Sequence, residues 1–203
     1  LDKDYFLKNL LQIIDTLKTE SKIISSTGYT SREILYLRKN FRFNKSNDFY
    51  MVGGMGHTGS VALGYSLKSK KNVICIDGDG SFLMHLGSIK TLANFANKNL
   101  KYILLNNNSH DSVGGQNTYI DRIDIKNLAK SISFQSFISI GTKTNMKKKL
   151  YKFLSEKKIG FMEVKISNNK KKLLPRPENL IKIKNKFIKE LSRICPDIDI
   201  NLN

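Results

Sequence analysis

The residues best suited to chemistry in this chain are an aspartate and an asparagine, Asp79 and Asn107. Asp79 belongs to the segment Gly-Asp-Gly-Ser at 78–81, and Asn107 is the middle one of three consecutive asparagines at 106–108. Their side chains offer a carboxylate and a neutral amide oxygen, and the loop after Asn107 can add a backbone carbonyl. This ligand set suits Mg²⁺, which takes few protein ligands and completes its octahedron with water and phosphate oxygens.

Both polar groups directly follow apolar, β-branched runs, at 73–76 and 102–105. Such runs are typical of buried parallel strands, so we expect both groups at the carboxyl ends of neighbouring strands, where open α/β sheets bind ligands. Apolar spacing over 82–96 predicts the crossover helix between these strands. Gly80 and Ser81 stand where that helix begins, so their N–H groups and the helix dipole favour a phosphate. A metal beside an anion indicates a magnesium-bound diphosphate.

Three further segments extend this pattern: Ser-Thr-Gly-Tyr-Thr-Ser-Arg-Glu at 26–33, Val-Gly-Gly-Met-Gly-His at 52–57, and His-Asp-Ser-Val-Gly-Gly-Gln at 110–116. Together with Gly-Asp-Gly and the spaced asparagines, they resemble the thiamine diphosphate-dependent 2-keto acid decarboxylases. Within that family the resemblance is closest to the phosphonopyruvate decarboxylases and slightly weaker to the sulfopyruvate decarboxylases. It covers roughly residues 6–167 and is confined to the diphosphate-binding domain of such enzymes.

The resemblance implies roles for individual residues. The metal ligands would be Asp79, Asn107 and the backbone carbonyl of Ser109. Gly53 would accept a hydrogen bond from the coenzyme's amino group, and Met55 would hold the coenzyme in a bent shape, for which a polarizable, unbranched side chain is suited. The alternative for Met55 is an ordinary core side chain. The other implied coenzyme contacts are Thr27, Gly28, Tyr29, Gly80, Ser81 and Ser112.

The histidines leave several roles open. His110 lies on a long polar loop, 108–121, and loops of this length are usually functional. It is the candidate catalytic residue, because an imidazole near the substrate could transfer a proton or hold a phosphonate oxygen. Its alternative role is to order the loop. His57 either faces the coenzyme or caps the next helix, and His85 is expected to be structural, within the crossover helix.

By resemblance, the activity is thiamine diphosphate- and Mg²⁺-dependent decarboxylation of an anionic 2-keto acid. Phosphonopyruvate, giving phosphonoacetaldehyde and CO₂, is the favoured substrate, and sulfopyruvate is the close alternative. The activating glutamate of such enzymes belongs to a pyrimidine-binding domain, which nothing in this sequence resembles. A partner domain or subunit is therefore implied, with the coenzyme at the interface of a hetero- or homo-oligomer. Because the chain begins with Leu1, we expect either the C-terminal part of a longer polypeptide or one subunit of a two-chain enzyme.

Two other functional classes are less consistent with the residues. A thiamine-dependent synthase or keto-acid oxidoreductase subunit is one, but such oxidoreductases usually carry iron–sulfur cysteines, and this chain has two cysteines in all. A basic nucleic-acid-binding module is the other, suggested by a net charge of +18 and a pI near 9.8. The lysines occur together with many asparagines, and no helix-turn-helix, zinc finger or RNP-type motif is present. Nucleic-acid binding is therefore disfavoured.

Composition and element order predict the fold class. A 203-residue chain that is 40% hydrophobic suits one sizeable α/β domain. No apolar run approaches the roughly 20 residues needed to span a bilayer, and no signal-peptide pattern precedes residue 5, so we expect a cytoplasmic protein without membrane contact. The alternating strands and helices predict a mostly parallel sheet with helices on both faces over 1–174. Pro175 and Pro177 mark a linker to a basic C-terminal helix and tail at 175–203. The expected helices cover 5–17, 31–39, 58–67, 82–96, 125–132, 145–156 and 178–194, and the expected strands cover 22–25, 49–52, 73–76, 102–105, 137–140 and 160–166.

Overall fold

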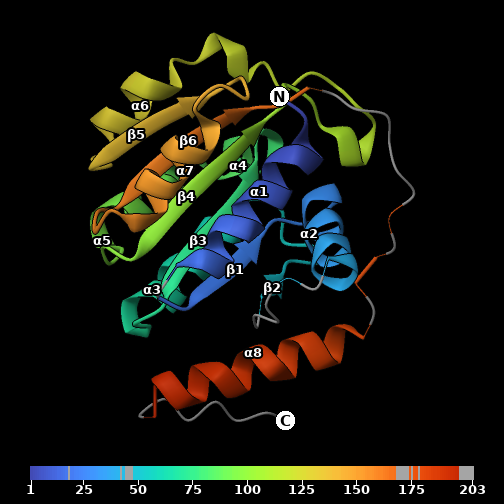
Figure 1. Ribbon diagram of the computed structural model, residues 1–203, viewed down its shortest axis with the longest axis vertical. Helices are drawn as coiled ribbons and strands as arrows, with labels where there is room; N and C mark the ends of the chain where they lie inside the picture. The colour runs from blue at the N-terminus through green and yellow to red at the C-terminus, as the bar shows by residue number, and fades with distance from the viewer. Residues whose placement is uncertain are drawn as a thin grey trace.

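The computed structural model describes residues 1–17, 19–41, 43, 48–167, 174, 176–177 and 179–196. Within these ranges six strands form one sheet in the order β2-β1-β3-β4-β6-β5 (Figure 1). The strands are β1 Ser21–Ser25, β2 Phe49–Tyr50, β3 Asn72–Gly78, β4 Leu100–Asn106, β5 Ser136–Ile140 and β6 Gly160–Lys165. All neighbouring strands pair in parallel. The predicted parallel α/β architecture is confirmed.

Helices cover both faces of the sheet because the central strands are apolar on both sides. On β3, Ile74 and Ile76 pack into one apolar cluster, while Val73 and Cys75 pack into the other. The first face carries α1 Lys3–Thr16, α2 Tyr29–Asn40 and α7 Met146–Ser155; Figure 1 shows α1 and α7 lying over it. The second face carries α3 Thr58–Lys68, α4 Asp79–Met84, α5 Leu86–Phe95, α6 Ile125–Ser131 and α8 Leu180–Ile194.

The crossover after β3 differs from the single helix predicted over 82–96. The strand continues through Gly78, Asp79 already belongs to the first turn of α4, and the chain breaks at His85 before α5 begins. The backbone of His85 is not helical (φ −134°, ψ 48°). Apolar residues of both pieces face the same cluster, so their spacing does not register the break. The prediction that His85 lies within a helix is therefore wrong. His85 is exposed at the junction between α4 and α5.

The edge strand β2 is also shorter than the predicted 49–52. It pairs with β1 only over Phe49 and Tyr50, and the following Val52 is 52% exposed. Val52 is apolar, so the sequence pattern included it in the strand, but no helix covers it and it does not join the sheet. The chain between β2 and α3 is instead a loop with three glycines in left-handed conformation, at 53, 54 and 56.

The C-terminal helix α8 packs on the body of the molecule near β2, at the bottom of Figure 1. Phe187 stacks on Phe49 with 4.1 Å between ring centroids, and Leu191 and Ile194 join the second apolar cluster. Two residues of the predicted linker and helix, Pro175 and Glu178, lie outside the described residues. Among the helices that the structure describes, none combines the length and apolar character required to cross a bilayer.

Candidate functional site

A pocket opens at the carboxyl ends of β1, β3 and β4. After β1 the chain turns to α2 on one face, and after β3 it turns to α4 on the other. Loops that diverge in this way leave a crevice between neighbouring strands, which is where open α/β sheets bind their ligands. Ten of the residues predicted for the site line this pocket: Thr27, Tyr29, Met55, Asp79, Gly80, Ser81, Asn107, Ser109, His110 and Ser112.

The remaining two predicted residues, Gly28 and Gly53, lie next to the lining. Gly28 caps α2 with φ 88°, a left-handed conformation that glycine adopts without steric cost. A Cβ at this position would also lie only 3.0 Å from the Cβ of Ser112 across the pocket. The Gly53 N–H donates to Oγ1 of Thr27 (3.3 Å). Gly53 therefore links two pocket loops, and Gly28 allows the Ser112 loop to approach closely.

Asp79 is the central charged group of the pocket. It is 2% exposed, and its Oδ2 accepts hydrogen bonds from the Ser109 N–H (3.1 Å) and the Thr118 hydroxyl (2.8 Å). Burial raises the pKa of Asp79, and the hydrogen bond from Thr118 opposes this shift. No Lys, Arg or His within the described ranges forms an ion pair with Asp79. A buried carboxylate with only neutral donors is electrostatically suited to a cation.

The loop after β4 carries the other two candidate ligands. The Asn107 side-chain amide donates to Oδ2 of Asp111 (2.7 Å), and the Ser109 hydroxyl donates to Oδ1 of Asp111 (2.9 Å). Because the Ser109 N–H also contacts Asp79, this loop lies against the carboxylate that begins α4. In the part of the chain that the structure describes, no three His, Cys, Asp or Glu side chains gather as a metal site. One carboxylate, one amide oxygen and one carbonyl are instead the ligands that Mg²⁺ accepts together with phosphate oxygens.

The anion side of the pocket is formed by two helix beginnings. Neither α2, which starts at Tyr29, nor α4 has a side chain capping its first turn. The uncapped N–H groups of the 12-residue α2 and its dipole favour an anion at this position. A side chain at Gly80 would collide with the imidazole ring of His110, so the loop and α4 approach closely here. The residues present thus fit a magnesium diphosphate.

Sequence reasoning missed one residue that lines the pocket, Lys3, and one buried carboxylate beside it, Asp77. Asp77, which is 1% exposed, accepts from the Tyr102 hydroxyl (2.8 Å) and the Gly78 N–H (3.0 Å), and burial raises its pKa. Its place directly before the Gly-Asp-Gly segment was a usable signal. Lys3 lines the pocket and pairs with Glu33 (3.0 Å), but no motif surrounds it, so only the fold reveals it.

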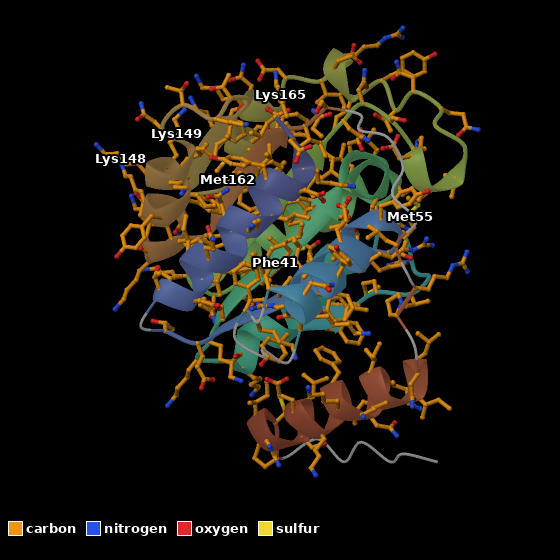
Figure 2. The ribbon with its side chains drawn as sticks, turned by 45° about the vertical axis from the view of Figure 1, so that its right-hand side comes forward. Phe41, Met55, Lys148, Lys149, Met162 and Lys165 are labelled. Atoms are coloured by element: carbon orange, nitrogen blue, oxygen red, sulfur yellow. The ribbon has the colours of Figure 1, made fainter. Side chains whose placement is uncertain are left out.

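Met55 and His57 lie on the loop between β2 and α3. The Gly56 N–H donates to the Ser81 hydroxyl oxygen (2.9 Å), which ties the Met55 loop to α4. His57 is exposed and makes no side-chain cap at α3; its ring lies against that of His85, 4.2 Å between centroids. Figure 2 shows Met55 on the opposite side of the molecule from Lys148 and Lys149 of α7. These lysines of α7 therefore lie away from the pocket.

Comparison with known proteins agrees with this geometry. A family model described as "Thiamine pyrophosphate enzyme, C-terminal TPP binding domain" matches residues 27–164. The chain belongs to this family. The matched part of this thiamine pyrophosphate-binding domain extends from Thr27 at the pocket through the whole of the loop that carries Asn107 and Ser109.

Individual relatives include both substrate classes. The domain is 37% identical to the phosphonopyruvate decarboxylase of Streptomyces hygroscopicus over 66% of this chain and 32% of that protein. It is 39% identical to the sulfopyruvate decarboxylase subunit beta of Methanothermobacter thermautotrophicus over 55% of this chain and 58% of that subunit. The chain thus spans about a third of the first relative and somewhat more than half of the second.

A solved structure shows the same fold. The 2-oxoglutarate:ferredoxin oxidoreductase of Magnetococcus marinus superposes with a TM-score of 0.61 at 15% sequence identity, covering 87% of this chain and 69% of that one. At this identity the likeness concerns the fold alone.

Cys75 and Cys195 are both buried and form no disulfide with each other, so the described chain offers no pair of exposed thiols.

Proposed function

We propose that this domain binds thiamine diphosphate with Mg²⁺ and, together with a pyrimidine-binding partner, decarboxylates phosphonopyruvate to phosphonoacetaldehyde and CO₂. The observation that carries the proposal is Asp79, a buried carboxylate in a pocket at a strand switch point, held against the Ser109 loop by neutral donors. A divalent cation would supply the positive charge that the described protein groups do not.

The cation would be held by Asp79, the amide oxygen of Asn107 and the backbone carbonyl of Ser109. Its remaining positions would take water and phosphate oxygens, as is usual for Mg²⁺. Thr27, Gly28 and Tyr29 would bind the diphosphate on the α2 side, and Gly80 and Ser81 would bind it on the α4 side. These contacts orient the coenzyme relative to the sheet.

When bound, the coenzyme supplies a carbon nucleophile and an electron sink for decarboxylation. The protein's part is to position it and exclude water. Met55 lines the pocket on the loop tied to Ser81, where it would support the bent coenzyme, and the Gly53 carbonyl would accept from the coenzyme's amino group. Ser112, which faces Gly28, would close the same side.

An anionic substrate is supported by the cationic and proton-carrying groups at the pocket. Lys3 lines it from α1, and His110 lines it from the loop, with its Nδ1 buried and without a hydrogen-bond partner in the described chain. We assign His110 the role of holding an oxygen of the substrate's tetrahedral anion or delivering a proton from this nitrogen.

A partner domain is required by the proposal because the chain matches only part of its relatives. It aligns with about a third of a phosphonopyruvate decarboxylase and with beta subunits of sulfopyruvate decarboxylases. The missing activating group would come from that partner, with the coenzyme between the two domains.

Sulfopyruvate is the second candidate substrate, favoured by the 39% identity to a sulfopyruvate decarboxylase beta subunit. Phosphonopyruvate and sulfopyruvate both end in a tetrahedral anion and differ mainly in charge. The preference for phosphonopyruvate rests on the segments at 27–33 and 110–116.

Calorimetry with thiamine diphosphate and Mg²⁺, in the presence and absence of a pyrimidine-binding partner, tests the proposal. We expect uptake that requires the cation and is lost in Asp79→Ala. CO₂ release from phosphonopyruvate and from sulfopyruvate, compared with pyruvate, then identifies the substrate. Absence of coenzyme uptake even with the partner, or unchanged uptake by Asp79→Ala, would overturn it.

A further inference from the structure

We propose that Asp111 is a positioning residue, which orients the loop ligands Asn107 and Ser109 toward the cation without binding it. This inference rests on the proposed function, because it concerns the same Mg²⁺ site. Asp111 begins the short 3₁₀ turn Asp111–Val113 and lines the pocket beside both residues.

The hydrogen bonds of Asp111 determine which way the Asn107 amide points. An ionised carboxylate only accepts hydrogen bonds, so the group that Asn107 presents to Oδ2 of Asp111 at 2.7 Å must be its NH₂. The amide oxygen therefore points the other way. Without Asp111 the amide could rotate and present its NH₂ group to the cation, which would repel it.

The second oxygen of Asp111 holds the neighbouring ligand. Its Oδ1 accepts from the Ser109 hydroxyl at 2.9 Å, while the N–H of the same Ser109 donates to Asp79 at 3.1 Å. Ser109 is thus held from two sides, by its side chain and by its backbone. Its peptide carbonyl is thereby kept at a constant place relative to Asp79.

The other side-chain hydrogen bonds described for this loop do not involve the Asn107 amide. Thr118 donates to Asp79 (2.8 Å) and also contacts the Asn108 side-chain oxygen (3.3 Å). Asn108 itself has a left-handed backbone (φ 56°). Of the hydrogen bonds described for the Asn107 side chain, the one to Asp111 orients its amide.

Each oxygen of Asp111 accepts a hydrogen bond from one of the two residues that it orients, which is the arrangement of a residue that acts through the ligands. Residues that orient metal ligands commonly contribute about 10- to 100-fold to metal affinity. We expect a loss of that size on removing Asp111.

The first test measures the Mg²⁺ concentration that half-saturates thiamine diphosphate binding, by calorimetry on the full chain with its partner. Asp111→Ala should raise this concentration about tenfold or more, and Asp111→Asn, which keeps one acceptor oxygen, should raise it less. The matched control is Asp121→Ala, which removes an exposed carboxylate from the same loop and should leave it unchanged. Equal values for wild type and Asp111→Ala would refute the inference.

A double-mutant cycle separates positioning from direct ligation. If Asp111 acts through Asn107, Asp111→Ala should change the half-saturating Mg²⁺ concentration much less in an Asn107→Ala background than in wild type. An undiminished effect in that background would mean that Asp111 acts on the cation by itself, and would overturn the positioning role.

Failure of the proposed function is distinguishable from failure of this inference. If wild type takes up no coenzyme with Mg²⁺, the proposed function fails; if it does and Asp111→Ala behaves identically, only the role of Asp111 fails. NMR of the Asn107 side-chain NH₂ group, without coenzyme, checks the contact itself. Its resonances should shift in Asp111→Ala and not in Asp121→Ala, and unchanged resonances would contradict the hydrogen bond.

Discussion

Two buried acidic centres at opposite ends of the sheet, Glu190 and Asp79, differ in whether they are matched, that is, paired with an oppositely charged side chain. At the amino ends of the strands, Glu190 of α8 pairs with Lys22 and Lys71 and accepts from the Tyr65 hydroxyl (2.6 Å). At the carboxyl ends, Asp79 has neutral donors and no ion pair among the described residues. Asp77 beside it is held likewise, by Tyr102 and a backbone N–H.

The pKa shifts reflect this difference. Burial raises the pKa of Asp79 and of Asp77, and their hydrogen bonds only partly oppose it. Burial would also raise the pKa of Glu190, but the hydrogen bonds from Lys22 and Tyr65 lower it overall. Buried charges that are paired with each other have a structural role and do not require a ligand. An unmatched buried carboxylate has a desolvation free energy that no opposite charge offsets. A bound cation would offset it, so such carboxylates indicate a binding site.

Breaking the matched end should give the largest change in stability. Glu190→Ala leaves the 2%-exposed Lys22 without its carboxylate partner, and removing one member of a buried pair costs about 3 kcal/mol or more of unfolding free energy. Urea unfolding measures this. Glu20→Ala, which removes a 79%-exposed carboxylate from Lys71, should cost less than about 1 kcal/mol. Equal losses of unfolding free energy in the two variants would show that the buried Glu190–Lys22 pair stabilises the protein no more than an exposed ion pair does.

Neutralising the unmatched end should affect binding instead of stability. Asp79→Asn keeps an acceptor for Ser109 and Thr118 but removes the charge, so we expect thiamine diphosphate affinity at fixed Mg²⁺ to fall by more than the roughly 10- to 100-fold that loss of a ligand-orienting residue costs. Urea unfolding without coenzyme should be unchanged or slightly improved, because an unmatched buried charge is lost. A large loss of stability without coenzyme would place Asp79 in the same class as Glu190.

Acidification should separate the two ends. Metal ligands must be deprotonated, so the raised pKa of Asp79 predicts that Mg²⁺-dependent coenzyme affinity declines already at pH values above those where an ordinary aspartate titrates. The lowered pKa of Glu190 means that its contribution to stability is present above the ordinary glutamate pKa and is lost only as pH falls further. Calorimetry and urea unfolding over the same series of buffers compare the two. Affinity that persists until the protein unfolds would contradict the assignment.

The smallest expected effect concerns a single hydroxyl. Tyr65→Phe removes one donor to Glu190 while Lys22 and Lys71 remain, so unfolding free energy should fall by about 1 kcal/mol. Coenzyme binding should not change, because Tyr65 lies at the opposite end of the sheet. Chemical unfolding and calorimetry of this variant check both statements, and an altered coenzyme affinity would mean that the two ends communicate.

Much of the site was predictable because it follows strand ends. Apolar runs at 73–76 and 102–105 place Asp79 and Asn107 at one edge of a parallel sheet, whatever the details of the helices. The helix break at His85 was not predictable, since α4 and α5 bury their apolar residues in one cluster and keep a continuous spacing. Sequence reasoning also gave α8 an apolar face, but its buried Glu190 reads as one more surface charge until Lys22 is seen opposite it.

The sequence by itself determined the fold class and the end of the sheet at which Asp79 and Asn107 emerge. These follow from local patterns: apolar runs bury strands, and the polar residues after them emerge together. The tertiary structure alone decided which charges are matched. Lys3 reaches the pocket from α1, Asp111 lines it and Thr118 contacts Asp79 from the loop after β4, and Glu190 reaches Lys22 across 168 residues. Electrostatic energy depends on distance and burial in space, and neither quantity is readable along the chain.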